Sequence, residues 1–326
     1  MSGGGAIPVF RSVTEVPADF GPSVAAIGNF DGVHLGHRSI LEAAKKEARS
    51  LGVRSVAVTF HPHPEKVLRP ERAPKLLTPL LEERIRLLAC TGVDAILLLP
   101  FNEVLARVEA WEFARRVLKE ALEVRAVHEG RSFRFGHGAR AGVKEMAAMG
   151  AEMGFRVHVH HALRVHGLEI SSSAVRAAVA AGDVRRARWM LGRPFCVVST
   201  QARGRGVGTR LLVPTVNLAA YEGLLPGHGV YVTGIAIGGR RFQAVTNVGE
   251  RPTFEGVGFG VETHILDFEP VEMDESTPVE LEFLLRLRGE QKFSSPEELK
   301  EQILRDVTRA KRFFRLAKGW DSRSCA

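Results

Sequence analysis

Two histidines and three glycines gather in one short run near the start of the chain. His34 and His37 close the ten residues from Gly28 to His37, directly before a segment of helical period. Glycines let the backbone approach a bound phosphate, a helix N-terminus offers free amide donors, and imidazoles can donate hydrogen bonds to phosphoryl oxygens. The run predicts an anion site; the alternative is a glycine-rich turn with solvent-exposed histidines.

Three further segments of the first half could add to such a site, although each is weak when read alone. Residues 59–64 (TFHPHP) bracket histidines with prolines, which is more often a rigid turn than a site. Residues 130–136 (GRSFRFG) combine glycines with phenylalanines. Residues 170–176 (ISSSAVR) place a serine run before Arg176, which a helix cap would explain equally well.

The second half carries a loop rich in glycine and arginine that ends in a Pro-Thr-x-Asn sequence, from Gly204 to Asn217. It matches neither a Walker A loop nor a G-x-G-x-x-G fingerprint, so those templates do not argue for nucleotide binding. A flexible basic hairpin tip is the alternative. Farther on, Glu262, His264 and Leu266 share one face of a predicted strand, where Glu262 could simply be an exposed carboxylate.

Alternating strand and helix patterns must position the first-half motifs. The expected strands are Val24–Asn29, Ser55–Phe60, Ala95–Leu99, Arg125–Glu129 and Arg156–His160. The expected helices are Arg38–Ser50, Leu80–Cys90, Ala110–Leu122 and Val143–Met153. Such alternation predicts a doubly wound parallel sheet with helices on both faces, of the Rossmann-like type. Ligands bind at the carboxyl ends of its strands, so chemistry is expected in the loops after Ile27, Phe60 and Val127.

The pattern changes after the helical stretch Ala174–Leu191, which Gly192-Arg193-Pro194 ends. The expected strands are Phe195–Thr200, Gly229–Ile237, Arg241–Thr246, Val261–Phe268 and Val279–Leu287, spaced by glycine and proline turns. They predict a small antiparallel barrel, followed by a terminal helix over Ser295–Leu316. A boundary near Arg188 therefore divides the chain into domains 1–187 and 188–326.

Bulk properties narrow the class of protein. The chain of 326 residues is 45% hydrophobic and can bury two cores, which excludes disorder as its main state. The three cysteines form no C-x-x-C pair, which argues against a disulfide framework and a cysteine zinc site. No signal peptide or membrane span is evident, so we expect a cytoplasmic protein. A net charge of +8 suits polyanionic partners, either nucleoside triphosphates or nucleic acid.

The first-half motifs resemble those of one family and follow its order. The run Gly28 to His37 resembles the H-x-G-H signature of the nucleotidyltransferase superfamily, in the form of its FAD synthetase branch. The other segments are similar to that branch's proline-bracketed flavin loop (59–64), its G-x-[DN]-F-x-F-G segment (130–136) and its I-S-S-T-x-I-R element (170–176). Motifs that are weak singly become specific when four of them occur in order.

This resemblance implies an adenylyl transfer, in which the phosphate of FMN attacks the α-phosphorus of ATP and pyrophosphate leaves. An ionised phosphate needs no general base, so the protein must mainly align the reactants and neutralise the leaving group. By resemblance, the ATP phosphates are held by His34, His37, Ser172, Ser173 and Arg176. The ATP site also includes Gly28, Phe30, Asp31, Gly32 and Gly36. The flavin site is lined by Pro62, Pro64, Ser132 and Phe135, although Ser132 stands where the family has Asp or Asn.

The second-half motifs resemble riboflavin kinases. The loop with Gly204, Gly206 and Gly208 looks like their phosphate loop, and Thr215 and Asn217 match the residues that help to hold magnesium and ATP. Residues 247–254, 261–267 and 286–293 are similar to three further kinase segments, the second of which carries Glu262 as the general base. Leu212 and Val213 replace Gly-Phe, Val216 replaces Ala, and the Tyr-Gly turn before Val279 is absent.

The sequence therefore predicts a bifunctional enzyme that phosphorylates riboflavin to FMN and adenylylates FMN to FAD. Its expected catalytic residues are His34, His37, Arg176 and Glu262, with Mg²⁺ accompanying ATP. The expected partners are riboflavin, FMN, FAD and ATP, without nucleic acid or membrane, and a homo-oligomer is compatible with the sequence. Two alternatives stay open: an adenylyltransferase whose kinase half has drifted at Leu212 and at 276–279, and a basic nucleic-acid-binding regulator that senses flavin.

Overall fold

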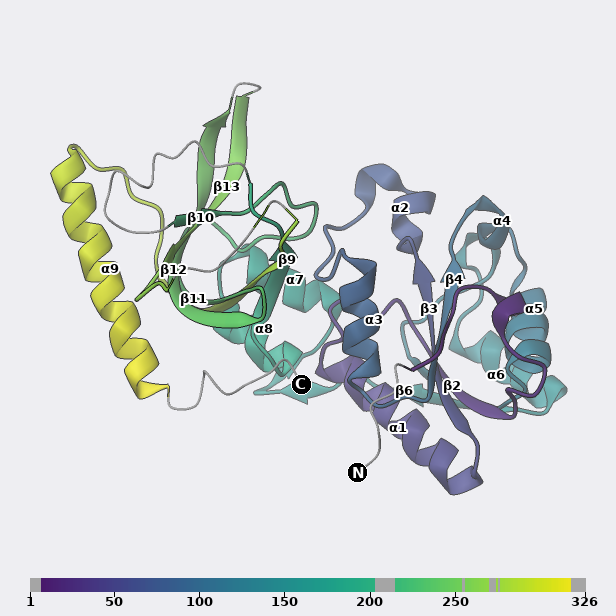
Figure 1. Cartoon of the computed structure of the whole chain (residues 1–326). Helices are drawn as coiled ribbons and strands as arrows, with labels where there is room; N and C mark the ends of the chain where they lie inside the picture. The colour runs from purple at the N-terminus through teal and green to yellow at the C-terminus, as the bar shows by residue number, and fades with distance from the viewer. Residues whose placement is uncertain (1–6, 203–214, 254–255, 270–273, 275, 318–326) are drawn as a thin grey trace. The chain divides into compact units, whose positions relative to one another are not determined.

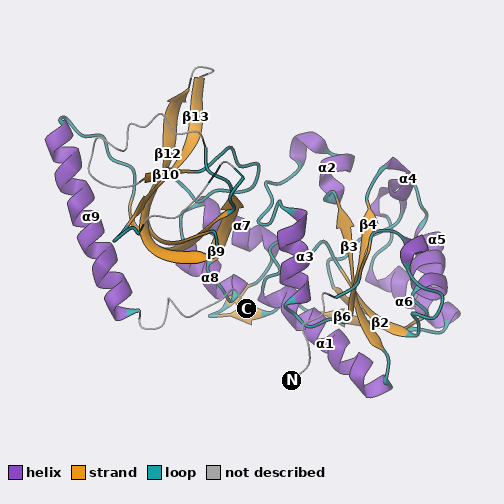
Figure 2. Ribbon diagram, in the orientation of Figure 1, coloured by secondary structure: helices purple, strands orange, loops and turns teal. Residues whose placement is uncertain are grey.

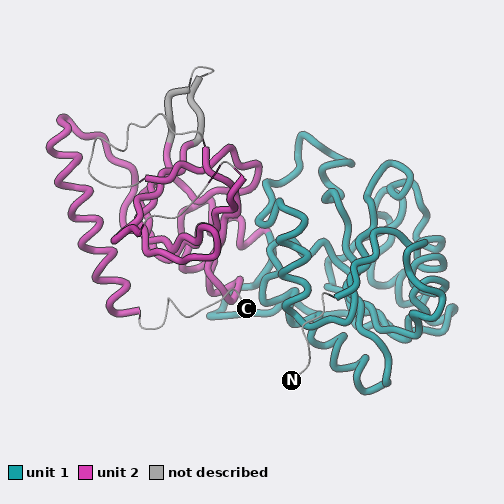
Figure 3. Tube along the Cα trace, viewed as in Figure 1, with its two compact units in different colours: residues 1–172 teal, residues 173–326 magenta. Residues whose placement is uncertain are grey.

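The computed structural model of the chain describes residues 7–202, 215–253, 256–269, 274 and 276–317, with the backbone alone for 250–253 and 256–259. The chain divides into two compact units, Met1–Ser172 and Ser173–Ala326 (Figure 3). The boundary of 187/188 expected from the sequence falls inside helix α8 (Val184–Leu191). The two units are described separately below.

The first unit alternates strands and helices along the chain, as the sequence predicts (Figure 1). Its strands are β1 (Val9–Phe10), β2 (Ser23–Ile27), β3 (Arg54–His61), β4 (Ala95–Pro100), β5 (Val124–Gly130), β6 (Arg156–His160), β7 (Arg164–Val165) and β8 (Leu168–Glu169). Its longer helices are α1 (Leu35–Leu51), α3 (Leu81–Ala89), the pair α5 (Ala110–Phe113) and η3 (Ala114–Ala121), and α6 (Val143–Met153). Shorter helical segments are η1 (Val13–Glu15), α2 (Pro64–Leu68), η2 (Pro70–Arg72), α4 (Glu103–Ala106) and η4 (His137–Ala139).

A parallel sheet forms the centre of this unit. Within the described residues it has six strands in the order β1-β4-β3-β2-β5-β6. The chain runs outward from β2 to β3 and β4, and then crosses to β5 and β6 on the other side of β2. The strand order therefore reverses at β2, and the crevice at its carboxyl end is where open α/β sheets bind ligands. This confirms the predicted doubly wound sheet.

Successive residues of each strand point to opposite faces of the sheet, and both faces are covered by helices. Val24 and Ala26 of β2 belong to the core beneath α1 and α3, whereas Ala25 and Ile27 belong to the core beneath α5, η3 and α6. Helix α1 contributes a stripe of Leu41, Ala44 and Ala48 and ends at Gly52, whose φ of 66° suits a glycine cap. This amphipathic helix fixes the position of the residues at its N-terminus.

The second unit is built around an antiparallel sheet (Figure 2). It contains α7 (Ser172–Ala180), whose first residue is the last of the first unit, and α8. Its strands are β9 (Phe195–Ser199), β10 (Thr215–Asn217), β11 (Gly229–Ile237), β12 (Arg240–Thr253), β13 (Gly256–Ile265) and β14 (Val279–Arg288), followed by α9 (Pro296–Leu316). Among the described residues the six strands lie in the order β10-β13-β12-β11-β14-β9.

The sheet curves until its two edges meet. The amide of Ala202 donates to the carbonyl of Asn217 at 2.8 Å, and that of Ala219 donates to Thr200 at 2.9 Å, so the chain just after β9 pairs with β10. Helix α9 covers the outer face, where Ala310 and Phe314 pack in one core with strand residues. The small barrel and the terminal helix are therefore as predicted.

Two local features differ from the sequence-based expectation. The helical stretch 174–191 is two helices, because the chain breaks at Gly182, whose φ is 75°, and Asp183 caps α8 by accepting a hydrogen bond from the amide of Arg186. Residues 215–217, expected at the end of a loop, form strand β10. A three-residue strand gives too short an alternation to be recognised by pattern alone.

Candidate active sites

The run from Gly28 to His37 lies directly at the reversal point of the first sheet. Gly28 follows β2, and its amide donates to the carbonyl of Val58 in the neighbouring strand at 3.1 Å. The last residue of β2, Ile27, is in register with Val58 on one side and with Glu129 of β5 on the other. The run therefore crosses the carboxyl edge of the sheet before α1 begins.

His34 and His37 are brought together as a stacked pair. Their ring centroids are 3.6 Å apart, and the amide of His37 donates to Nδ1 of His34 at 3.2 Å, which makes His34 the N-cap of α1. Since Nδ1 of His34 accepts a hydrogen bond, the proton of the neutral ring is on Nε2. Burial, and secondarily the neighbouring His34, hold the pKa of His37 well below its usual value, so its ring is neutral at pH 7. The pair can offer N–H donors to an anion.

The loop between β2 and α1 has an unusual backbone. Phe30 and Val33 adopt left-handed φ angles of 50° and 37°, which a β-branched residue such as Val33 rarely does. Both side chains are buried, at 1% and 2% exposed. At Gly32, with φ of 80°, a Cβ atom would lie 2.7 Å from the Leu77 side chain. Strain of this kind persists where the surrounding packing imposes it, and it is concentrated at functional sites.

Two buried charged groups, one in this loop and one outside it, hold it in place. The carboxylate of Asp31, which is 1% exposed, accepts hydrogen bonds from the amides of Leu77 at 3.1 Å and Thr78 at 3.0 Å. The guanidinium of Arg84 on α3 donates to the carbonyls of Asn29 at 3.2 Å and Phe60 at 2.8 Å. Asp31 was predicted in the ATP site, and the structure places its carboxylate on backbone amides. Arg84 was not identified from the sequence.

The two predicted flavin segments meet through one aromatic residue. Phe60, which precedes the histidine–proline loop, has its ring centroid 6.3 Å from that of Phe113, and Phe113 is 5.9 Å from Phe135. Pro62 is half-buried, and Pro64 is the first residue of α2. Phe135 is 7% exposed and lies in the core, whereas Ser132 is exposed. The role of these residues in flavin binding stays a prediction.

The serine motif lies where the chain passes from one unit to the next. The hydroxyl of Ser172 donates to the backbone carbonyl of Asp31 at 3.0 Å, which brings two predicted ATP-site segments together. Ser173 and Arg176 belong to the second unit and lie on α7, where Nη2 of Arg176 is 3.4 Å from the hydroxyl of Ser173. Their part in ATP binding stays a prediction.

In the second unit, strand register brings together the residues predicted for the kinase reaction. Asn217 of β10 lies directly opposite Glu262 of β13, and Asn247 of β12 lies opposite Glu262 on its other side. Thr215 lies opposite His264. Residues directly opposite each other in an antiparallel pair share one face, with Cβ atoms about 4.5–5.5 Å apart. The oxygen-bearing side chains of Thr215, Asn217 and Asn247 therefore project from the same face as the carboxylate of Glu262.

The opposite face of the same strands is closed to ligands. A ladder of threonine hydroxyls joins Thr233, Thr246 and Thr263 at 2.7 and 3.0 Å, and all three residues are 0% exposed. Because strand residues alternate, this buried ladder places Glu262 and Asn217 on the outer face. Burial lowers the pKa of His264, and the nearby negative charge of Glu262 partly offsets this effect. The predicted phosphate-loop glycines Gly204, Gly206 and Gly208 lie outside the described residues.

One buried acid near the first site was not identified from the sequence. Glu129 stands at the carboxyl end of β5, is 0% exposed, and neither of its carboxylate oxygens has a hydrogen-bond partner among the described residues. Burial raises its pKa to about 7. The sequence pattern indicates a buried strand here. Nothing in the sequence shows that a carboxyl group takes the place of an apolar side chain in it.

Comparisons with known proteins agree with these two sites. Residues 16–174 match the family model of FAD synthetase, and residues 191–314 match that of riboflavin kinase. A protein of Pseudomonas fluorescens named bifunctional riboflavin kinase/FMN adenylyltransferase is 37% identical over 289 residues, which cover 88% of this chain and 92% of that protein. The chain belongs to this bifunctional family. It is therefore an enzyme of flavin cofactor biosynthesis with kinase and nucleotidyltransferase domains, as predicted.

Other relatives extend the likeness over nearly the whole chain. Bifunctional riboflavin kinase/FMN adenylyltransferases of Escherichia coli K12 and Bacillus subtilis are 35% and 31% identical, each covering 90% of this chain and over nine-tenths of their own length. A crystal structure of a Streptococcus pneumoniae protein titled macrolide-efflux protein is 26% identical, with a TM-score of 0.83 over 94% of this chain and 99% of that one. In the part of the chain that the structure describes, none of the helices has the length and apolar character needed to cross a membrane.

Proposed function

We propose that residues 1–187 transfer AMP from ATP to FMN, and that residues 188–326 transfer the γ-phosphate of ATP to riboflavin. The observation that carries this division is that the FAD synthetase match covers most of the first unit, whereas the riboflavin kinase match lies within the second. FMN made by the kinase domain would then be the substrate of the other domain. We place the enzyme in the cytoplasm, as a monomer or homo-oligomer, without nucleic acid or membrane as a partner.

The adenylyl transfer needs alignment and charge neutralisation. A phosphate oxygen of FMN forms a bond to the α-phosphorus of ATP as the bond from that phosphorus to the pyrophosphate oxygen breaks. His34 and His37, neutral and stacked at the N-terminus of α1, would donate hydrogen bonds to the phosphate oxygens on which charge develops. Ser172, Ser173 and Arg176 would hold the remaining phosphates. No proton has to be removed, and a general base is not required.

The kinase reaction differs because its nucleophile is a neutral alcohol. Glu262 would accept the proton of the riboflavin 5′-hydroxyl as the hydroxyl oxygen bonds to the γ-phosphorus and ADP leaves. The side-chain oxygens of Thr215 and Asn217, on the same face as Glu262, are of the type that Mg²⁺ prefers, so these two residues would hold the ion. The metal, when bound with ATP, supplies positive charge to the phosphate oxygens.

Product analysis tests this function directly. Purified protein is incubated with riboflavin, ATP and Mg²⁺, and the flavins are separated by chromatography over time. FMN should appear first and FAD should follow. Formation of FAD from supplied FMN, without any conversion of riboflavin, would instead leave adenylyl transfer as the sole activity.

Fragments test which residues each reaction needs. A fragment of residues 1–187 should convert FMN to FAD, whereas one of residues 1–172, which ends with the first compact unit, should not, because it lacks Ser173 and Arg176. Circular dichroism of both fragments establishes that each is folded. Equal adenylylation by the two folded fragments would remove Ser173 and Arg176 from the site.

A further inference from the structure

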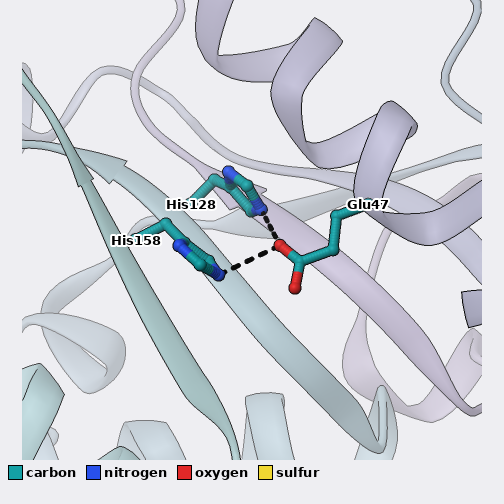
Figure 4. Close-up of side chains that lie close together, drawn as sticks. All are labelled: Glu47, His128 and His158. Atoms are coloured by element: carbon teal, nitrogen blue, oxygen red, sulfur yellow. Dashed lines mark hydrogen bonds and ion pairs between the residues drawn. The ribbon is translucent and has the colours of Figure 1, made fainter. Parts of the chain in front are cut away.

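Two imidazoles and a carboxylate meet on the first unit at a point that neither reaction uses (Figure 4). Glu47 comes from the C-terminal half of α1, His128 from β5 and His158 from β6. Oε2 of Glu47 lies 2.7 Å from Nε2 of His128 and 3.1 Å from Nε2 of His158. These ligand atoms all lie within 4.8 Å of one another.

The fold itself produces this cluster. His128 and His158 are directly in register in the parallel pair of β5 and β6, so both side chains are on the face that α1 covers. Ala44 and Ala48 of α1 pack against the sheet, which brings the intervening Glu47 to its edge. The three residues are separated by 81 and 30 positions in the sequence, so no motif spacing could reveal them.

The contacts around the cluster orient two imidazole nitrogens toward one carboxylate oxygen. Nδ1 of His128 is 2.9 Å from Nε2 of His160, which fixes the ring and leaves Nε2 of His128 facing Glu47. Arg156 binds the other carboxylate oxygen, Oε1, at 2.7 Å and leaves Oε2 to the histidines. Nε2 of His158 is buried and makes no hydrogen bond within the described residues.

Two imidazole nitrogens and one carboxylate oxygen are together a set of atoms that can bind a metal ion, and the folded chain presents all three within 4.8 Å of one another.

We propose that Glu47 Oε2, His128 Nε2 and His158 Nε2 form a binding site for a divalent transition-metal ion of the Zn²⁺ type. Two imidazoles with one carboxylate are typical ligands of zinc, which bonds to them at about 2.0–2.2 Å, whereas Mg²⁺ and Ca²⁺ prefer oxygen ligands. The side chain of His158 is 43% exposed while its Nε2 atom is buried, so the site lies just beneath the surface of the unit. His160 orients His128 from behind, as partners of metal-bound histidines do.

Such an ion would join α1 to strands β5 and β6, which carry His128 and His158. Because the folded state presents all three ligands together and the unfolded chain does not, binding would stabilise the first unit by mass action. The site is distinct from the predicted Mg²⁺ site of the second unit in both its residues and its metal preference. It would thus act on the stability of the fold without taking part in either transfer.

Calorimetric titration of the metal-free full-length protein with Zn²⁺ tests the site, in the absence of ATP and Mg²⁺. Glu47→Gln and His158→Ala should each lower the affinity of the site by at least about tenfold. His161→Ala, which removes an exposed histidine of the same segment, should leave the affinity unchanged. Zn²⁺ should also raise the unfolding temperature of the parent protein more than Mg²⁺ does at equal concentration.

Zn²⁺ could bind elsewhere, above all at the stacked His34 and His37, so the comparison among variants decides the outcome. The high-affinity equivalent of Zn²⁺ should persist in His37→Ala and be lost in Glu47→Gln. Co²⁺ absorption in the parent and His158→Ala proteins gives a second readout that does not depend on stability, because its visible bands report nitrogen and oxygen ligands. Parent-like Zn²⁺ affinity in both folded ligand variants, or absence of binding to the parent, would overturn the proposal.

Discussion

The two candidate active sites are held in place by different means. In the first unit a strained loop carries His34 and His37, and groups far along the chain hold that loop at the edge of the sheet: the amides of Leu77 and Thr78, which donate to Asp31, and the guanidinium of Arg84. In the second unit the register of neighbouring strands places Asn217 opposite Glu262. The first site should therefore be sensitive to its supporting residues, and the second mainly to the reacting residues themselves.

Replacing the proposed base should have the largest effect. Glu262→Gln keeps the shape of the side chain and removes its basicity, so riboflavin phosphorylation should fall by about 10²–10⁴-fold. Conversion of supplied FMN to FAD should proceed at the parent rate, because the strand register is unaltered. Rates of both reactions are measured by flavin chromatography. Glu280→Gln on β14 is the matched control and should change neither rate; normal phosphorylation by folded Glu262→Gln would exclude the base role.

Replacing a histidine of the stacked pair should slow the adenylyl transfer and leave the kinase reaction unchanged. His37→Ala removes one hydrogen-bond donor from the helix N-terminus, and the loss of one such donor at a developing charge costs about 10²-fold in rate. FAD formation from FMN should slow accordingly while FMN formation continues. His137→Ala, at a half-exposed histidine of the same unit, serves as the control. If adenylylation in His37→Ala matches that of the parent, His37 does not contact the reacting phosphates.

Replacing the supporting residue Arg84 should lower the stability of the first unit more than replacing a neighbouring arginine does. Arg84→Met removes the guanidinium that donates to the buried Phe60 carbonyl and one of the two side-chain donors to the Asn29 carbonyl, so the unfolding free energy of the first unit should fall by about 3 kcal/mol. Arg86→Met on the same helix breaks the partly exposed ion pair with Glu83 and should cost at most about 1 kcal/mol. Urea denaturation measures both. Equal stabilities of the two variants would refute the bracing role of Arg84.

The buried acid beside the first site should give the smallest effect, one that depends on pH. Burial raises the pKa of Glu129 to about 7, above its usual range, so the folded protein holds this proton more tightly than the unfolded chain. The stabilising contribution of the protonated form is complete at acid pH and is lost as the pH rises toward 7. Between pH 5 and pH 7 the parent should lose about 2 kcal/mol relative to Glu129→Gln.

Urea denaturation of parent and Glu129→Gln at several pH values measures this difference. A constant difference in unfolding free energy across that range would mean that Glu129 is ionised in the folded state. Glu145→Gln, at the exposed start of α6, should show no comparable change as the pH rises from 5 to 7.

Local patterns were enough to predict most of the fold. The strands β3, β5, β6 and β11 and the helices α1, α6 and α9 lie within a few residues of their expected bounds, because each has a clear period and a glycine, proline or polar cap at its ends. Where the pattern was short or interrupted the prediction was wrong. The break at Gly182 divides one expected helix into two, and β10 was expected as loop.

Contacts between distant segments could not be predicted in the same way. The motifs named Asn217 and Glu262, but only strand pairing shows that they are directly opposite. Asp31 looked like a ligand-binding residue, whereas its carboxylate accepts from Leu77 and Thr78, some 46 residues away. Arg84 belongs to no motif at all, because its function depends on the carbonyl groups of Asn29 in a loop and Phe60 in a strand, which are distant from it in the sequence.

The buried ion pair between Arg288 of β14 and Asp306 of α9 bears on how the protein is made. Asp306 is 1% exposed and its carboxylate is 2.9 Å from the guanidinium of Arg288, while Ala310 and Phe314 pack on the same sheet. During synthesis the ribosome releases Arg288 well before these partners. The first unit can thus fold while translation continues, but the second must wait until α9 leaves the exit tunnel. A ribosome stalled before Phe314 would leave an uncovered sheet for chaperones to shield.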